Sequence, residues 1–210
     1  MRHSIVKRQN PEHKQSKSND LETLKLAEQE GLVHIKYLDE SGFSLPSVIG
    51  YTWAEVGKQK RIEQPNRRGK RISVLGIYAP GEAFNYGVSL GSIKNDVYIE
   101  LMDWEAKRAA ERLAETGQIT VIVQDNYSVH KHWRVKERWP VWERQGLYVF
   151  FLPVCCPEMN RIEEEWHQVK AHHMKCRSFE MEYELAEAVI EAIDERYLGK
   201  GLQCERYLFN

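Results

Sequence analysis

The sequence predicts an α/β domain in which a mixed β-sheet carries helices on both faces. Segments 119–123 (Ile-Thr-Val-Ile-Val) and 147–152 (Leu-Tyr-Val-Phe-Phe-Leu) are nearly continuous apolar runs, which are typical of strands covered on both faces. Segment 33–38 alternates apolar and polar residues, as a half-buried strand does. Stretches with the spacing of amphipathic helices separate these strands, and this alternation indicates an α/β fold.

The first half of the chain predicts a helix, a strand, a hairpin and a second helix. Residues 1–18 are polar and are expected to form a flexible basic tail. Asn19 is expected to cap a helix that Gly31 ends. Segments 72–79 and 83–90 flank Pro80-Gly81, a favourable pair for a type II turn. Residues 95–116 predict a helix closed by Gly117, with inward side chains Ile99, Met102, Ala106, Ala109, Ala110 and Leu113.

The second half continues with strands and helices in alternation. A helical stretch at 132–145 is expected to be interrupted by Pro140. Strand 147–152 ends at Pro153, and helices at about 160–175 and 180–197 complete a domain placed at residues 19–198, followed by a C-terminal tail at 199–210. This order of elements predicts a ribonuclease H-like sheet with helices on both faces.

Composition limits the classes of protein that the chain can represent. Its 210 residues suit one domain, and 30 basic against 31 acidic side chains argue against general nonspecific DNA affinity. The longest apolar stretch, residues 147–156, is too short to cross a bilayer, and the N-terminus lacks the apolar region of a secretory signal. Four cysteines do not form a disulfide framework. We therefore expect a cytoplasmic protein with reduced thiols and no membrane partner.

Positive charge is concentrated in two segments. The run at 58–71 holds seven basic residues and one acid, and five more basic residues lie among the first 17 residues. Such local runs suit a polyanion that is gripped at defined places. A solvated loop and tail explain either run by itself equally well.

Two of the predicted strands lead into an aspartate. Asp39 continues the row of alternate side chains 33, 35 and 37, and Asp125 continues the row 119, 121 and 123. If these strands are parallel neighbours, both acids lie at the carboxyl edge of the sheet, where α/β proteins bind ligands. Two close carboxylates repel unless a cation lies between them, and Mg²⁺ is such a cation. The alternative is that each aspartate simply forms a turn.

A third acid lies in the segment Asn160-Arg-Ile-Glu-Glu-Glu-Trp166. On a helical wheel Glu163 and Glu165 flank a buried stripe formed by Ile162, Trp166, Val169 and His173, whereas Glu164 points away. Glu163 could therefore reach the sheet edge. Spacing by itself favours a different role, in which Asn160 caps the helix and Glu163 completes a capping box.

Four blocks of the sequence carry a family resemblance. They are Tyr37-Leu-Asp-Glu-Ser-Gly-Phe43, Thr52-Trp-Ala54 with Gly57, Gln124-Asp-Asn-Tyr-Ser-Val-His130, and Leu152-Pro-Val-Cys-Cys-Pro-Glu-Met-Asn-Arg-Ile-Glu163 with Trp166 and Lys170. In this order they resemble the DDE endonuclease domain of bacterial insertion-sequence transposases of the mariner superfamily, over roughly residues 20–195.

The resemblance implies chemistry and ligands. Asp39, Asp125 and Glu163 would be the catalytic and metal-binding triad, with one Mg²⁺ or Mn²⁺ ion shared by the two aspartates and a second held by Asp39 and Glu163. The implied activity is DNA strand cleavage and strand transfer at transposon ends. Double-stranded DNA, as transposon end and as target, would be the partner of a homo-oligomer at the nucleoid.

The resemblance also suggests supporting roles for other residues. Asn126, His130 and Asn160 are expected to hold the three acids in place. Candidates for gripping DNA phosphates are Lys58, Lys60, Arg61, Arg67, Arg68, Lys70, Arg71 and Lys170. A zinc site that joins His172 and Cys176 to Cys155-Cys156 is disfavoured because the spacing lacks a C-x-x-C knuckle. The six tryptophans fit core packing better than base stacking.

The sequence departs from the family at three places. Pro153-Val-Cys-Cys-Pro157 replaces the usual Pro-Pro-Tyr-Ser-Pro, and Arg161 stands where proline is usual. Only about 30 residues precede the first strand, so we expect the family's helix-turn-helix domain to be absent from these 210 residues. Two other functions stay open: a ribonuclease H-like nuclease that cuts without joining, and an inactive remnant that binds DNA or another transposase subunit.

Overall fold

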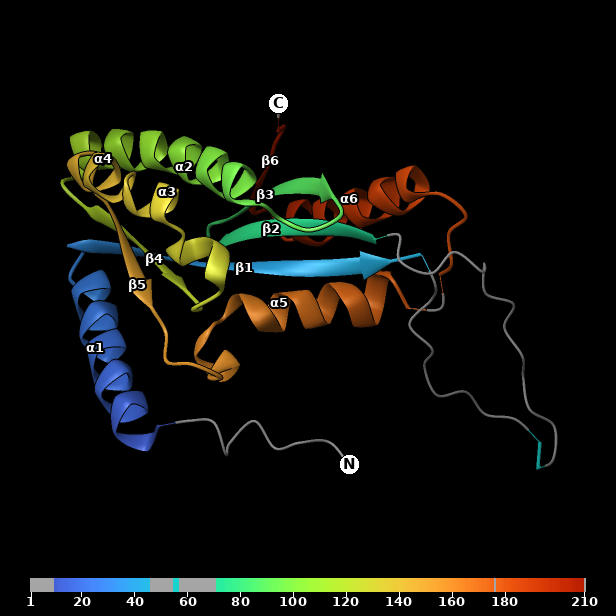
Figure 1. Cartoon of the computed structure of the whole chain (residues 1–210), viewed down its shortest axis with the longest axis horizontal. Helices are drawn as coiled ribbons and strands as arrows, with labels where there is room; N and C mark the ends of the chain where they lie inside the picture. Colours follow the sequence, from blue (N-terminus) through green and yellow to red (C-terminus); the bar gives the residue numbers. More distant parts are fainter. Residues whose placement is uncertain (1–9, 46–54, 57–70, 176, 210) are drawn as a thin grey trace.

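A six-stranded mixed sheet forms the centre of the molecule (Figure 1). The computed structural model describes residues 10–45, 55–56, 71–175 and 177–209. The strands are β1 (Val33–Ser44), β2 (Arg71–Ala79), β3 (Ala83–Leu90), β4 (Ile119–Gln124), β5 (Leu147–Phe151) and β6 (Gln203–Tyr207), in the spatial order β5-β4-β1-β2-β3-β6. Strands β5, β4 and β1 are parallel, β2 is antiparallel to β1 and β3, and β6 is parallel to β3. The predicted mixed sheet is confirmed.

Helices cover both faces of this sheet. They are α1 (Pro11–Gln29), α2 (Asn95–Thr116), α3 (Trp133–Lys136), α4 (Trp139–Arg144), α5 (Ile162–Gln168) and α6 (Glu182–Leu198), with a π-helical turn η4 (Val169–His173) directly after α5. Figure 1 shows α2 and α4 on one side of β1 and α5 on the other. In the described ranges, no helix combines the length and the apolar character that crossing a membrane requires.

Two hydrophobic clusters, one on each face, hold the layers together. One cluster joins the sheet to α1, α5 and α6, and the other joins it to α2, α3 and α4. Ile35 and Tyr37 of β1 and Val121 and Val123 of β4 belong to the first cluster. The two rows that lead to Asp39 and Asp125 therefore point toward the face that α5 covers.

The hairpin and the long helix agree closely with their predicted bounds. Strands β2 and β3 are joined at Pro80-Gly81, where Gly81 takes a φ of 77°, as the third position of a type II turn requires. Helix α2 spans the predicted residues and ends at Gly117 in a left-handed conformation. Its buried face is turned relative to the prediction, because Tyr98 and Leu101 are fully buried whereas Leu113 is half-exposed.

The N-terminal prediction is wrong for residues 11–18. Helix α1 begins at Pro11 and includes Asn19 in its interior, and residues 1–9 lie outside the described ranges. The cap is Asn10, whose Oδ1 accepts hydrogen bonds from the backbone N–H groups of Glu12 and His13 at 3.1 and 3.2 Å. Proline in the first turn lacks an N–H that would otherwise be unpaired, so it favours a start at this position.

Three other element bounds also differ from the prediction. Strand β1 continues past Asp39 to Ser44 because β2 pairs with it along its whole second half. The helical stretch at 132–145 is interrupted as predicted, but the break lies between α3 and α4, and Pro140 itself is in the first turn of α4. Residues 203–207 of the predicted C-terminal tail form strand β6 beside β3.

Candidate active site

The two aspartates follow neighbouring parallel strands in matching register. Strands β1 and β4 pair from Val33 opposite Ile119 to Tyr37 opposite Val123. Asp39 and Asp125 each come two residues later, so both side chains lie at the same edge of the sheet. Because Asp39 is inside β1, opposite Gly76 of β2, the turn-forming alternative for Asp39 is wrong.

Asp125 has its own fixed environment. Its Oδ1 accepts a hydrogen bond from the backbone N–H of Tyr127 at 2.9 Å, so this aspartate does close a turn. The Nδ1 atom of the buried His130 lies 3.1 Å from the same oxygen, and the His130 ring packs on Tyr98 with ring centroids 4.7 Å apart. Burial opposes ionisation of Asp125, but the contacts with His130 and Tyr127 outweigh it and lower the pKa of this carboxyl. Asp125 is therefore held as a carboxylate.

Asn160 attaches the start of α5 to the sheet edge that carries the two aspartates. Its side-chain Nδ2 donates to the carbonyl of Leu38 at 3.0 Å, next to Asp39, and its own carbonyl accepts from the N–H of Glu163 at 3.1 Å. Helix α5 has Arg161 as its N-cap residue, without a side-chain cap bond. The capping-box alternative is therefore wrong, and the Glu163 carboxylate is left available for the site.

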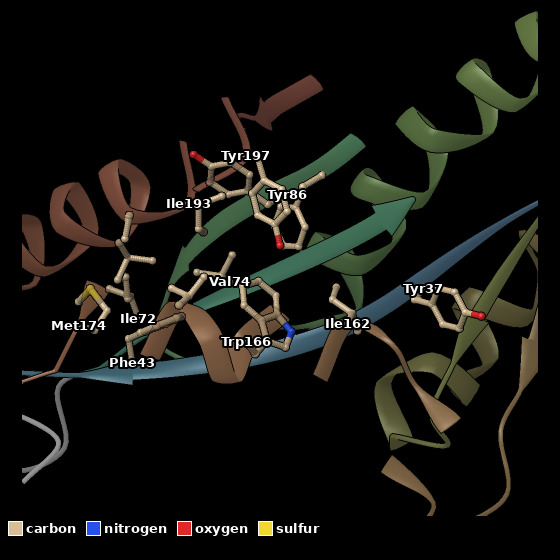
Figure 2. Close-up of a cluster of buried hydrophobic side chains, with 14 of the residues drawn as sticks. Tyr37, Phe43, Ile72, Val74, Tyr86, Ile162, Trp166, Met174, Ile193 and Tyr197 are labelled. Carbon is tan, nitrogen blue, oxygen red and sulfur yellow. The ribbon is translucent and has the colours of Figure 1, made fainter. Parts of the chain in front are cut away.

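Close packing sets the height of α5 above the sheet. Trp166 lies directly over Gly76, where an added Cβ atom would be 2.6 Å from the indole Cζ2 atom. The indole also makes edge-to-face contacts with Phe43 and Phe84, at centroid distances of 6.4 and 5.3 Å. Figure 2 shows Trp166 of α5 among the side chains of the sheet, with Phe43 and Val74 beside it. Glycine opposite Asp39 thus lets α5 approach closely enough to bring Glu163 to the aspartates.

The other two acids of α5 point elsewhere. Glu165 is buried, and its Oε2 accepts hydrogen bonds from Arg196 Nε and the Tyr197 hydroxyl of α6, both at 2.8 Å. Glu164 is exposed and accepts from Gln168 Nε2 at 2.7 Å. Glu163 is the acid of this turn that lines a pocket together with Asp125.

Burial and mutual repulsion perturb the pKa values of Asp39 and Glu163. Burial, followed by the charges of Glu163 and Asp125, raises the pKa of Asp39 to about 8. Partial burial and the charge of Asp125 also raise the pKa of Glu163. Burial lowers the pKa of Lys170, although the charges of Asp39 and Glu163 favour its protonated form. The charges of the three acids and of Lys170 therefore influence one another, and a bound cation would reduce the repulsion between the acids.

Two pockets meet at Glu163. One, of about 410 Å³, is lined by Asp125, Asn126, Tyr127, the loop 152–157, Asn160 and Glu163. The other, of about 420 Å³, lies toward Tyr78 and Arg161. The loop is held by Asn126, whose Nδ2 donates to the Leu152 carbonyl while Lys131 Nζ donates to its Oδ1. Glu163 is therefore open to a ligand from both pockets, and Asp125 from one of them.

The donor set fits a hard divalent cation. It consists of carboxylate oxygens, and the buried Oδ1 of Asn160 beside them has no hydrogen-bond partner. Within residues 10–45, 55–56, 71–175 and 177–209, no three His, Cys, Asp or Glu side chains converge on a single ion position. An ion at this edge would thus take two carboxylates from the chain and complete its coordination with other oxygens.

The structure tests the predicted DNA-binding residues only in part. Lys58 to Lys70 lie outside the described residues, as does Cys176. Arg71 opens β2 and donates to Ser92 Oγ at 2.7 Å, away from the acids. Lys170, on the π-helical turn after α5, lies over the ring of Phe43 at 5.2 Å and next to Asp39 and Glu163. Of the predicted basic residues that are described, Lys170 is the one at the site.

Sequence reasoning missed two residues that position the site. Gly76 could not be recognised, because its role depends on which residue of β2 lies opposite Asp39. Arg196, which binds Glu165, lies 31 residues away in the chain and shows no local signal. The prediction that the tryptophans pack in the core holds for Trp142 and Trp166, which are buried, but not for Trp133, which is 61% exposed.

Comparisons with solved structures identify the same fold in Mos1 mariner transposase. A paired-end complex with Mn matches with a TM-score of 0.65 at 14% identity over 87% of this chain and 55% of that chain. A strand transfer complex matches with a TM-score of 0.61 at 16% identity over 87% and 54%. The isolated catalytic domain gives 0.61 at 12% identity over 91% and 83%.

These likenesses support the ribonuclease H-like arrangement of the sheet. The chain spans about half the length of the transposase chains in the complexes, and most of the isolated catalytic domain. No curated protein matches the sequence. A family model described as a DDE superfamily endonuclease matches residues 34–186, which include all three acids. Because this match covers most of the 210 residues, the chain belongs to the DDE superfamily of endonucleases.

Proposed function

We propose that this chain is the catalytic domain of a mariner-type transposase, which cleaves DNA strands at transposon ends and joins them to target DNA. The observation that carries the proposal is the meeting of Asp39, Asp125 and Glu163 at one sheet edge, where burial and the charges of the other two acids raise the pKa of Asp39 to about 8. An arrangement that is unfavourable without a ligand suggests a site made for a cation.

We assign Asp39, Asp125 and Glu163 as ligands of two Mg²⁺ or Mn²⁺ ions. Asp39 lies between the other two acids in the electrostatic network, so it is the carboxylate suited to be shared. Bound ions would supply Lewis acidity to the attacking and leaving oxygens of a phosphodiester. Matching Mos1 structures contain Mg or Mn, which agrees with this choice of cation.

The surrounding residues would keep the acids ready for substrate. His130 orients the Asp125 carboxylate through the 3.1 Å contact and stabilises its ionised form. Asn160 fixes the start of α5 to the carbonyl next to Asp39. Lys170 places an ammonium group beside two of the acids, where it can contact a phosphate oxygen of the DNA backbone.

The partner proposed from these residues is double-stranded DNA. The structural matches include complexes described as paired-end and strand transfer complexes of Mos1, which supports transposon ends and target DNA as partners. We extend the proposal to a homo-oligomer assembled on DNA, because joining two ends to a target requires two active sites.

Nicking of a supercoiled plasmid tests the proposed activity. We expect cleavage in Mg²⁺ or Mn²⁺ and none in EDTA, with DNA binding but little turnover in Ca²⁺, whose longer and looser coordination misplaces the reacting oxygens. Asp39→Asn, Asp125→Asn and Glu163→Gln should each abolish nicking. Glu164→Gln is the matched control on the same helix and should nick normally. Full activity in EDTA would refute the assignment.

Products separate transposition from the two other functions. An oligonucleotide with a free 3′-hydroxyl should become covalently joined to the plasmid if the chain transfers strands. Nicking without joined product would indicate a ribonuclease H-like nuclease. DNA binding without nicking in either cation would indicate an inactive remnant.

A further inference from the structure

An exposed aromatic ring lies on the wall of the catalytic pocket. Tyr127 is 43% exposed and comes two residues after Asp125. It lines the 410 Å³ pocket whose other members include Asp125 and Glu163. The proposed metal chemistry uses no phenol, and no side-chain hydrogen bond to the Tyr127 hydroxyl is found in the described part of the chain. This ring is therefore a feature of the pocket that catalysis does not explain.

Contacts with Asp125 and His130 hold Tyr127 in place. Its backbone N–H donates to Asp125 Oδ1 at 2.9 Å, so the residue moves with the catalytic acid. The ring meets His130 edge-to-face, with centroids 5.8 Å apart and planes at 83°. His130 is itself buried between Asp125 and Tyr98. A ring supported in this way loses little conformational freedom when a ligand binds to its open side.

The lining of the pocket also includes an aliphatic side chain. Val154 is 57% exposed and lies on the loop 152–157, which Asn126 ties to the end of β4 through the Leu152 carbonyl. The same pocket is lined by Asn160 and by the acids Asp125 and Glu163. The pocket thus combines an aromatic surface, an aliphatic side chain and polar groups directly beside the acids.

We propose that Tyr127 binds an unpaired nucleobase of the DNA, by stacking, next to the phosphodiester that the acids cleave. This inference rests on the proposed function and adds a recognition element to it. A base inside a duplex is covered by its neighbours on both sides, so only a base taken out of the stack can lie on the ring. Stacking is tolerant of sequence because every base has a π-face, and it needs no positive charge in a pocket lined by acids.

Binding to a bulged duplex tests the proposal. The probes are two labelled duplexes of arbitrary sequence, one with a single unpaired adenine and one with an abasic site at the same position, measured by fluorescence anisotropy in Ca²⁺. The wild-type chain should bind the unpaired adenine about 5- to 150-fold more tightly than the abasic duplex. Tyr127→Phe should keep this preference, and Tyr127→Ala should lose it while both variants melt like the wild type.

Trp133→Ala is the matched control, because Trp133 is a more exposed aromatic residue close in sequence that does not line the pocket. It should leave the preference unchanged. Equal affinity of the wild type for both duplexes, or a preference that survives in Tyr127→Ala, would overturn the inference while plasmid nicking still supports the proposed function. If Tyr127→Ala instead weakens only self-association in sedimentation, the ring is a protein contact. Wild-type protein that neither binds nor nicks DNA refutes both proposals.

Discussion

Replacing the central acid should stabilise the metal-free protein while it destroys activity. In the Asp39→Asn variant the amide keeps the size of the carboxyl but removes its charge. Because the pKa of Asp39 rises from 3.8 to about 8 on folding, the native state holds a proton that the unfolded chain releases over this range. Over this range the native state binds more protons than the unfolded state, so the free energy of unfolding falls as pH rises from about 4 to 8.

The size of the effect follows from the shift. A pH of 7 lies about three units above the pKa of 3.8 that Asp39 has in the unfolded chain, and this sets an upper limit of about 4 kcal/mol on the destabilisation of the native state. Relaxation of the exposed Asp125 and Glu163 side chains and screening by salt reduce this, so we expect Asp39→Asn to gain about 1–2 kcal/mol. For a chain of this size, that gain corresponds to a rise of about 2–8 °C in Tm.

Thermal melts in EDTA at several pH values measure this gain. The variant and the wild type should melt together near pH 4, and the variant should melt progressively higher toward pH 8. Addition of Mg²⁺ should stabilise the wild type and not the variant, because only the former binds the ion tightly. Asp20→Asn, which changes an exposed aspartate of α1, should change little. A variant that melts below the wild type at pH 7.5 in EDTA would refute the electrostatic reasoning.

Three further predictions concern the frame of the site. Lys36 and Glu105 form a buried ion pair, so Glu105→Gln should lower the free energy of unfolding by about 3–5 kcal/mol in urea denaturation, whereas the double change K36M/E105L should restore most of it. Burial lowers the pKa of His34 to about 4, so the unfolded chain binds its proton first, and the wild type should lose about 2 kcal/mol relative to His34→Gln between pH 7.5 and 5, a difference in which the opposite pH dependence of Asp39 cancels. Gly76→Ala should displace Trp166 and therefore reduce the nicking rate at saturating Mn²⁺, even at temperatures well below the Tm of the variant. An unchanged rate would show that the position of α5 does not depend on this contact.

The placement of Asp39 and Asp125 could be predicted from the sequence because strand periodicity is a local property. A period of two assigns Asp39 to the row of Ile35 and Tyr37, and the apolar run of β4 does the same for Asp125. The structure places both rows on the face covered by α5. Periodicity could not predict the end of β1, because Asp39 and the residues after it remain in the strand by pairing with residues of β2 that are 27 to 37 positions later in the chain.

The local reading of Glu163 failed for a related physical reason. Ser, Thr, Asp and Asn compete for nearby backbone N–H groups, so an asparagine three residues before a glutamate predicts a capping box. Asn160 instead uses its amide to satisfy the buried carbonyl of Leu38, a partner 122 residues away, and leaves Arg161 as the N-cap residue. A buried unpaired carbonyl costs more than a missing helix cap at a half-exposed helix end, so the tertiary bond prevails.

Gly76 and Asn160 together explain why α5 delivers Glu163 and not one of its neighbours. Asn160 fixes the start of the helix to β1, and the absence of a side chain at Gly76 lets Trp166 settle onto β2 one turn further on. These two contacts restrict both the height and the rotation of the helix, because one attaches the residue before its first turn to β1 and the other packs its body on β2. In this orientation Glu165 forms an ion pair with Arg196, and Glu163 lies on the side of the aspartates. The position of the third acid is thus set by two residues that carry no charge.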